Sequence, residues 1–336
     1  MPPIEIGTVA FPQPGRGAAA AAEAEADGYD VVRFPDTQNL GGDPFVQLAL
    51  AARSTSTILL GTSATNPITR HAAVTANAIL SIQVESGGRA ILGLGRGDSS
   101  MGHIGRKPAP MATYRRYVEQ VRTYLAGGEV DQRGFPSRNR WHDQFDLPAV
   151  PLDMVCSGPR SIALAATLAG RVSLTVGADP ERIHWGLETA HAAAEAAGRD
   201  PSTIKFGVSV NTTVDSDKQA GLEAIRGTIA AFAHFSAMDD APLEHQPERQ
   251  QRVSRQLREA YDTRSHGQPD AGHAQILDED FLDWFGVAGT ANEVIARLEP
   301  LVDLGLDHLY LIGSTRPPAR EAYATEVLPA LRRRAG

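Results

Sequence analysis

Short runs of apolar residues alternate along the chain with longer stretches in which apolar residues recur at helical spacing. The short runs are rich in Val and Ile and are continuous, which is typical of strands buried on both faces of a parallel sheet. Eight runs predict strands, at 4–11, 30–36, 58–65, 90–97, 151–158, 172–177, 204–214 and 308–314.

Amphipathic, mostly alanine-rich stretches follow these runs and predict helices. Asp43-Pro44 has the order of an N-cap followed by a first-turn proline, and Gly28 suits a C-terminal cap. The predicted helices cover 15–28, 43–54, 69–86, 112–126, 159–169, 180–198, 216–235, 290–304 and 320–334. Strands that each lead into a helix indicate an α/β fold, an eight-stranded parallel (β/α) TIM barrel, with a doubly wound open sheet as the second interpretation.

Two segments interrupt this alternation. Residues 127–150 have the glycines and prolines of a loop, and residues 236–285 form a polar insertion whose middle, 247–262, suits a helix. Insertions after barrel strands lie at the C-terminal face, where barrel active sites are built. We therefore expect residues 1–336 to form a single barrel domain in which 236–285 serves as a lid or substrate wall; a solvated flap or dimer element suits the segment equally.

Composition narrows the class of protein. The 336 residues are 42% hydrophobic, enough for a large core, and a formal net charge of −8 argues against nucleic acid as a partner. The single cysteine, Cys156, excludes an intramolecular disulfide and fits a reducing compartment. Because the chain has neither a secretory signal pattern nor an apolar stretch of ~18 residues, we expect a cytoplasmic protein that does not enter membranes.

The most conspicuous motif is RAILGLGRGDSS at 89–100, with Gly93, Gly95 and Gly97 at alternate positions before Asp98. A dinucleotide fingerprint would follow the first strand and place its third glycine one residue later, and a Walker loop would continue with Gly-Lys. Neither interpretation fits. The glycines either relieve crowding inside the barrel or allow a ligand to approach the backbone closely.

The next predicted strand ends in CSGPRS, at 156–161. Ser157 stands where an N-cap would, Gly158 leaves the backbone bare, and Pro159 suits the first helical position. The free amides at such a helix start bind anions. Two neighbouring strands thus offer a glycine platform and an anion site on one face of the barrel, which suits a phosphate-bearing cofactor.

Two further strand ends carry small or polar residues. GTSATNPITRH, at 61–71, leaves room for a flat ring, and FPDTQNL, at 34–40, places carboxylate, hydroxyl and amide groups at the barrel mouth. Cys156 is more simply a small buried strand residue than a nucleophile. His266 and His273 lack ligand spacing, so no metal site is expected.

These stretches together resemble the luciferase-like monooxygenase superfamily, and within it the deazaflavin-dependent branch that includes methylenetetrahydromethanopterin reductase. The resemblance rests on 61–99, on DTQ at 36–38, on 156–172 and on 285–313. It covers most of 4–235 and 285–334, while 236–284 matches nothing that can be transferred.

The resemblance implies an eight-stranded barrel that binds coenzyme F420, an 8-hydroxy-5-deazaflavin, and forms a homodimer. It implies a non-prolyl cis peptide at Ser63–Ala64 behind the central ring. The implied cofactor-binding residues are Asp36, Ser63, Ala64, Thr65, Asn66, Gly93, Gly95, Arg96, Gly97, Asp98, Cys156, Ser157, Gly158 and Pro159. Asp36 and Thr37 would lie at the reactive edge of the ring as the catalytic residues.

The expected reaction is therefore hydride transfer between C5 of coenzyme F420 and a small organic substrate bound at the barrel mouth, with Asp36, Thr37 or a nearby histidine handling a proton. An FMN-dependent luciferase-like monooxygenase is the alternative. A non-catalytic flavin-binding barrel subunit and a phosphosugar lyase or isomerase are further alternatives. For the lyase or isomerase, STRPPAR at 314–320 has little of the glycine that a phosphate loop needs.

Overall fold

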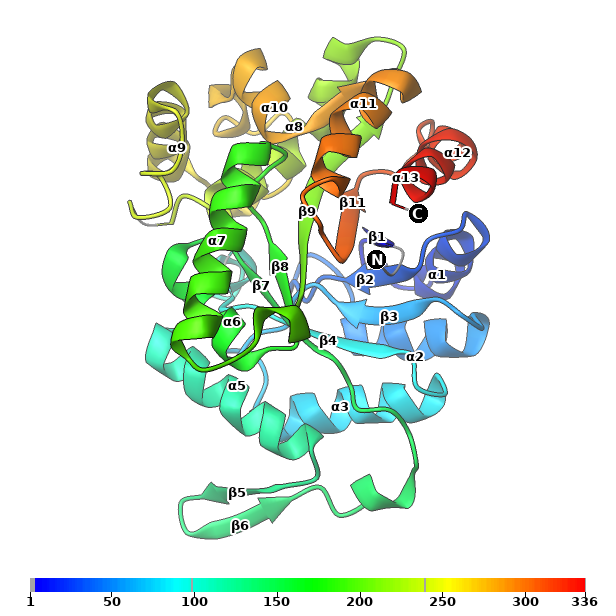
Figure 1. Ribbon diagram of the computed structural model, residues 1–336, viewed down its shortest axis with the longest axis vertical. Coiled ribbons are helices and arrows are strands. Elements are labelled where there is room, and N and C mark those ends of the chain that lie inside the picture. The colour runs from blue at the N-terminus through cyan, green and yellow to red at the C-terminus, as the bar shows by residue number, and fades with distance from the viewer. Residues whose placement is uncertain (1–3, 98, 239, 336) are drawn as a thin grey trace.

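Eight parallel strands close into a barrel in the computed structural model, which describes residues 4–97, 99–238 and 240–335 (Figure 1). The strands pair in chain order, and β9 pairs with both β8 and β11 while β11 pairs with β1, which closes the ring. They are β1 Glu5–Val9, β2 Val31–Phe34, β3 Leu59–Thr62, β4 Ala90–Leu94, β7 Leu152–Cys156, β8 Arg171–Leu174, β9 Lys205–Val214 and β11 His308–Ile312. The predicted TIM barrel and all eight predicted strands are confirmed.

Helices surround the barrel at the predicted positions (Figure 1). Asp43 accepts hydrogen bonds from the amides of Phe45 and Val46, so the predicted N-cap is present. The surrounding helices are α1 Gly17–Ala26, α2 Pro44–Ser54, α3 Ala72–Glu85, α5 Met111–Leu125, α6 Pro159–Leu168, α7 Pro180–Ala196, α8 Lys218–Phe235, α11 Ala291–Val302, α12 Arg320–Ala322 and α13 Leu328–Ala335, with a π-helical turn at Tyr323–Val327 between the last two.

The loop expected at 127–150 contains a β-hairpin, β5 Glu129–Gln132 and β6 Phe135–Arg138. Its turn residues Arg133 and Gly134 both have positive φ, 59° and 86°, the backbone of a tight two-residue hairpin turn. The sequence has Arg-Gly here instead of the usual Asn-Gly and a proline in the second strand, so it resembled a loop. Figure 1 shows the hairpin beyond α3 and α5, away from the barrel strands.

The insertion at 236–285 contains the expected polar helix, α9 Glu248–Ala260, and a second helix that was not predicted, α10 Glu279–Phe285. A short strand, β10 Val287–Gly289, then pairs with the end of β9. Figure 1 shows α9 and α10 beside α8, on the outer side of the barrel. Val253, Leu257, Phe281 and Leu282 are buried in a small core shared with α8.

The barrel interior contains buried charges as well as apolar side chains. Arg33 pairs with Asp153 at 2.8 Å, and both side chains are at most 1% exposed. Asp153 also accepts from the hydroxyl of Ser173, and Ser173 lies 2.9 Å from His308 Nε2. Burial alone would raise the pKa of Asp153, but Arg33 and Arg171 hold it below its ordinary value. This network joins β2, β7, β8 and β11 below the active-site end.

None of the helices within 4–97, 99–238 and 240–335 has both the length and the apolar character that a bilayer crossing requires.

Candidate active site

A cavity of about 430 Å³ opens at the carboxyl ends of the barrel strands. Its walls come from the segments that follow β1, β2, β3, β4, β7 and β11, from the last turns of α8, and from the insertion. Eleven predicted site residues line it: Asp36, Thr37, Ser63, Ala64, Gly95, Arg96, Gly97, Cys156, Ser157, Gly158 and Pro159. Residues from four predicted segments therefore meet in one cavity.

Three predicted cofactor-binding residues do not line this cavity. Gly93 lies inside the barrel, where an added Cβ would stand 2.0 Å from the carbonyl oxygen of Thr62. Thr65 and Asn66 are buried behind the wall, where Thr65 bonds to Asp36 and Asn66 accepts the amides of Ile68 and Thr69. The prediction for Asp98 falls outside the described residues.

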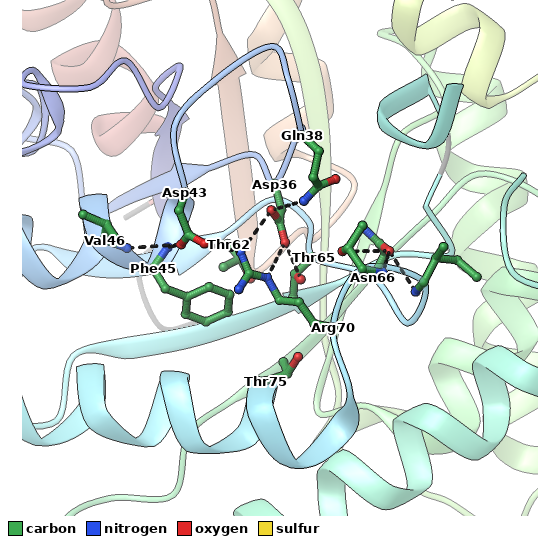
Figure 2. A network of polar contacts seen from close by, with 12 residues as sticks. Asp36, Gln38, Asp43, Phe45, Val46, Thr62, Thr65, Asn66, Arg70 and Thr75 are labelled. Atoms are coloured by element: carbon green, nitrogen blue, oxygen red, sulfur yellow. Dashed lines mark hydrogen bonds and ion pairs between the residues drawn. The ribbon is translucent and has the colours of Figure 1, made fainter. Parts of the chain in front are cut away.

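Asp36 follows β2 and is held by several donors, as Figure 2 shows. Its carboxylate accepts from Gln38 Nε2 at 2.6 Å and from Thr65 Oγ1 at 2.7 Å. Arg70 Nε donates to it at 2.9 Å and the same guanidinium reaches Asp43. With a side chain only 2% exposed and both oxygens occupied, Asp36 is suited to fixing the loop after β3.

Thr37, the next residue, differs from Asp36 in having an unused polar atom. Its hydroxyl is buried and has no hydrogen-bond partner among the described residues, and the residue itself lines the cavity. A buried hydroxyl without a partner costs about 1–3 kcal/mol, so a ligand atom that bonds to it would recover that energy.

The floor of the cavity is poor in side chains. The Ser63–Ala64 peptide is cis, as the resemblance implies. An isolated bridge between Thr65 and Leu94 holds this segment against the end of β4. A Cβ built on Gly95 would contact only Ala64, at 3.5 Å, so the backbone of Gly95 is open to the cavity. A flat ring can therefore approach the main chain here.

The strand β7 leads into helix α6 at the opposite wall. The N-cap is Gly158 instead of Ser157, since α6 begins at Pro159, and the Ser157 hydroxyl donates to the carbonyl of Phe235 on α8. Pro159 occupies the first helical position, as predicted. Gly158, Pro159 and Ser161 line the cavity, so the positive end of α6 is directed toward a ligand there.

Cys156 lines the same wall but is only 5% exposed. Burial raises the pKa of its thiol far above the ordinary value, and Asp153 adds to that shift. The thiol therefore stays protonated, which agrees with its interpretation as a small buried strand residue.

Several cavity residues were missed by the sequence reasoning. Arg316, in the loop after β11, lines the cavity and forms no ion pair with any described residue. Burial lowers its pKa, because no carboxylate compensates for lost water. Phe232 and Phe235 on α8 form an apolar wall with Met238, Pro242 and His266 of the insertion. The residue types in α8 and the insertion match no motif, and only the fold brings them to the cavity.

Within the described ranges, no group of three or more His, Cys, Asp or Glu side chains could hold a metal ion. The polar groups that line the cavity suit instead an organic ligand with a flat ring and anionic groups.

The fold and the cavity define a (β/α) barrel whose ligand site lies at the carboxyl ends of its strands. The chain belongs to the luciferase-like monooxygenase family, whose model matches residues 5–308.

Two relatives and one solved structure are similar to this chain over most of its length. The chain is 28% identical over 305 residues to the 5,10-methylenetetrahydromethanopterin reductase of Methanolobus tindarius, covering 89% of this chain and 90% of that protein. It is 27% identical over 332 residues to the F420-dependent glucose-6-phosphate dehydrogenase of Beutenbergia cavernae, covering 93% and 91%. The F420-dependent tetrahydromethanopterin reductase structure from Methanopyrus kandleri matches with a TM-score of 0.78 at 24% identity, covering 98% of this chain and 99% of that one.

Proposed function

We propose that this protein is a coenzyme F420-dependent oxidoreductase that exchanges a hydride with a small organic substrate. The observation that carries the proposal is the cavity floor at Ser63, Ala64 and Gly95, which is bare of large side chains and continuous with the N-terminus of α6. Relatives that align over nine-tenths of this chain are named for F420-dependent chemistry, which supports the same choice of cofactor.

The residues present fit this cofactor. The unpartnered Thr37 hydroxyl offers a hydrogen bond to the edge of a ring lying over Ser63, Ala64 and Gly95. The start of α6 and the guanidinium of Arg316 are suited to the anionic phosphodiester tail. A bound deazaflavin supplies a carbon that gives or accepts a hydride and, having no nitrogen at that position, does not form the peroxide that reduced FMN forms.

Within this proposal, Asp36 acts by positioning. Its two oxygens are committed to Gln38, Thr65 and Arg70, so it holds the loop after β3 against the loop after β2. Thr37 presents a hydroxyl to the ligand. The chain's contribution is to bind and orient both reactants and to exclude water, which together lower the barrier by several kcal/mol.

The insertion supplies the substrate wall. Phe232 and Phe235 end α8, and Met238 and Pro242 continue the apolar surface around the cavity. We infer that the substrate presents an apolar body to this wall.

A homodimer is part of the same proposal. Val46 and Leu50 on α2 and Val74 on α3 are 54%, 47% and 54% exposed, and α2 packs against α3. A second copy would cover this apolar surface. Sedimentation equilibrium tests it: the V46E/L50E variant should be monomeric while the wild type is dimeric, and a monomeric wild type would contradict it.

Titration of the purified protein with coenzyme F420 and with FMN tests the proposed function. Quenching of the deazaflavin fluorescence should saturate at one equivalent per chain. Failure to bind F420 would overturn the proposal, and binding of FMN alone, with oxygen uptake on reduction, would indicate a monooxygenase. Failure to bind either ring would indicate that the barrel does not use a flavin or a deazaflavin.

A further inference from the structure

The insertion contributes one ionisable side chain to the apolar wall of the cavity, His266. It is half-buried and lines the cavity next to Gly267. Its Nδ1 lies 2.5 Å from the hydroxyl of Tyr261, five residues earlier. We refer to these two residues as the Tyr261–His266 pair. No family motif covers this segment, and the function described so far makes no use of the pair.

The tyrosine of the pair is held in place from both sides. The ring of His234, at the end of α8, stacks on it with 3.8 Å between centroids and an interplanar angle of 11°. His273 packs on it at 4.3 Å, and the Nδ1 of His273 accepts the amide of Asp262. A ring confined in this way presents its hydroxyl in a single direction, so Tyr261 is suited to fixing the orientation of His266.

The surroundings of the pair favour a neutral imidazole. His266 packs near Phe235 and His103, at 6.1 and 6.3 Å between ring centroids. Burial, with smaller contributions from His103, His234 and His273, lowers the pKa of His266 to about 4. The histidine therefore carries no charge at neutral pH.

The hydrogen bond to Tyr261 selects one tautomer. A phenol is a stronger acid than a neutral imidazole N–H, so the phenol donates and Nδ1 accepts. The remaining hydrogen of the ring is then on Nε2, which forms no hydrogen bond with any described residue. A neutral histidine with this free N–H can donate a hydrogen bond, and then a proton, to an oxygen atom in the cavity.

We propose that His266 is a catalytic residue that exchanges a proton with a carbonyl or hydroxyl oxygen of the substrate, and that Tyr261 is its positioning residue. The inference rests on the proposed function. It assigns the substrate to the class of ketones and secondary alcohols with an apolar body, because Phe235 packs near His266 and Phe232, Met238 and Pro242 line the same cavity.

The step balances in atoms and electrons. In the direction of reduction, the carbonyl carbon receives a hydride, with its two electrons, from the reduced deazaflavin, and the C=O π bond opens. The oxygen takes the proton from Nε2 of His266 as Nδ1 takes the proton of Tyr261. The pair is restored when Nε2 takes a proton from the solvent and Nδ1 returns its proton to the tyrosine oxygen. Oxidation of the alcohol follows the same path backward. The imidazole remains neutral before and after the step, which agrees with its environment.

The four histidines near Tyr261 suggest a metal site as another interpretation, but among the described residues no set of three could hold a metal ion. The short contact to a phenol and the position on the cavity wall favour proton exchange.

The first test needs no cofactor. Long-range ¹H–¹⁵N spectra of the histidine rings in the apoprotein should show His266 as the Nε2–H tautomer from pH 8 to pH 5. In Y261F this signal should shift toward tautomer averaging, while the signal of the exposed His184 should stay unchanged. A protonated or Nδ1–H ring in the wild type would overturn the proposal.

The second test uses turnover with a panel of cyclic and open-chain ketones and the matching alcohols. H266Q should lose about 10²–10⁴-fold in kcat, the usual contribution of general acid–base catalysis. Its affinity for coenzyme F420 should stay within about threefold of the wild type, a difference below 0.7 kcal/mol. H184Q is the matched control and should keep full activity. Added imidazole should restore part of the kcat of H266G, which a purely structural histidine would not permit.

These outcomes separate the two proposals. If the protein does not bind F420, the proposed function fails. The tautomer measurement on the apoprotein still tests the hydrogen bond of the Tyr261–His266 pair. If F420 binds but no ketone or alcohol of the panel turns over or shifts the His266 signal, the inference fails and the proposed function stands. Full activity of H266Q on the panel would also overturn the inference.

Discussion

The guanidinium of Arg70 donates to the carboxylate of Asp36 at 2.9 Å, and this pair joins the loops after β2 and β3 (Figure 2). The carboxylate is 2% exposed and the guanidinium 17%. The pair lies directly behind Ser63 and Ala64 of the cavity floor, because Thr65 donates to the same carboxylate at 2.7 Å. We infer that the ion pair sets the shape of the floor.

Breaking the pair should destabilise the protein. Arg70→Met leaves a buried carboxylate without its counter-charge, which costs about 3–5 kcal/mol of unfolding free energy. Urea unfolding measures it. Arg115→Met is the matched control, since Arg115 pairs with Glu119 on an exposed helix surface and should lose at most about 0.5 kcal/mol. Equal losses in the two variants would contradict the role given to Arg70.

A positioning role for Asp36 predicts a particular kinetic pattern. Asp36→Asn should weaken binding of coenzyme F420 and lower stability, while kcat at saturating cofactor falls by less than about tenfold, short of the 10²–10⁴-fold that loss of a proton-transferring group produces. A larger loss of kcat with unchanged cofactor affinity would indicate that Asp36 itself transfers a proton.

Two neighbouring glycines should respond differently to the same substitution. In Gly95→Val the new Cβ meets only Ala64, at 3.5 Å, so the fold should persist while affinity for the deazaflavin falls by about 1–3 kcal/mol, roughly 5- to 150-fold. In Gly93→Val the Cβ would stand 2.0 Å from a backbone oxygen, so the protein should fail to fold or lose more than about 3 kcal/mol. Thermal unfolding and fluorescence titration separate the two. Unchanged affinity in Gly95→Val would refute the role of the floor.

Because the hydroxyl of Thr37 has no partner among the described residues, its removal should leave stability unchanged or higher and weaken cofactor binding. Thr37→Val removes a buried polar atom that has no partner, so stability should be unchanged or rise by up to about 1 kcal/mol. Affinity for coenzyme F420 should fall by about 0.5–1.5 kcal/mol, roughly 2- to 12-fold, since one hydrogen bond is lost. Thr37→Ser keeps the hydroxyl and should bind like the wild type. If both variants bind equally well, the hydroxyl does not contact the cofactor.

Buried histidines should make the protein less stable as the pH falls. Burial lowers the pKa of His308 to about 3, whereas an unfolded histidine titrates near 6.5. Between these values the unfolded state binds more protons, so stability decreases as the pH falls from about 6.5 toward 3. His308 alone should account for about 2 kcal/mol between pH 7 and pH 5, at 1.36 kcal/mol per unit.

The measurement is urea unfolding at pH 7 and pH 5. His308→Asn should show a smaller loss between the two, although its stability at pH 7 is lower, because the hydrogen bond with Ser173 changes. His184→Gln, exposed on α7, should keep the full loss. The same loss in His308→Asn as in the wild type would show that other groups carry the pH dependence.

The barrel was predictable because each strand and helix has a local signal. Val- and Ile-rich runs mark the eight strands, and Asp43-Pro44 marks a helix start by chemistry that acts within a few residues. The hairpin at 129–138 was missed because its Arg-Gly turn and Pro136 resemble a loop. The buried charges of Arg33 and Asp153 were also missed, since they pair across the barrel between strands far apart in sequence.

The site was predictable where it follows strand ends and less so elsewhere. Ser63, Gly95 and Gly158 belong to local motifs, and the cavity brings them together. Thr65 and Gly93 belong to the same motifs, but Thr65 bonds to Asp36 behind the cavity wall and Gly93 lies inside the barrel. These positions depend on the register of one strand against the next. Residues such as Arg316 and His266 reach the cavity only through tertiary folding, so no local pattern could identify them.

The most direct test of the account is a crystal structure of the protein with coenzyme F420. The deazaflavin ring should lie over Ser63, Ala64 and Gly95, with Thr37 at its edge and the phosphodiester at the start of α6. His266 should then border the space left for the substrate. A ring bound elsewhere, or a phosphodiester far from Gly158 and Ser161, would contradict the account.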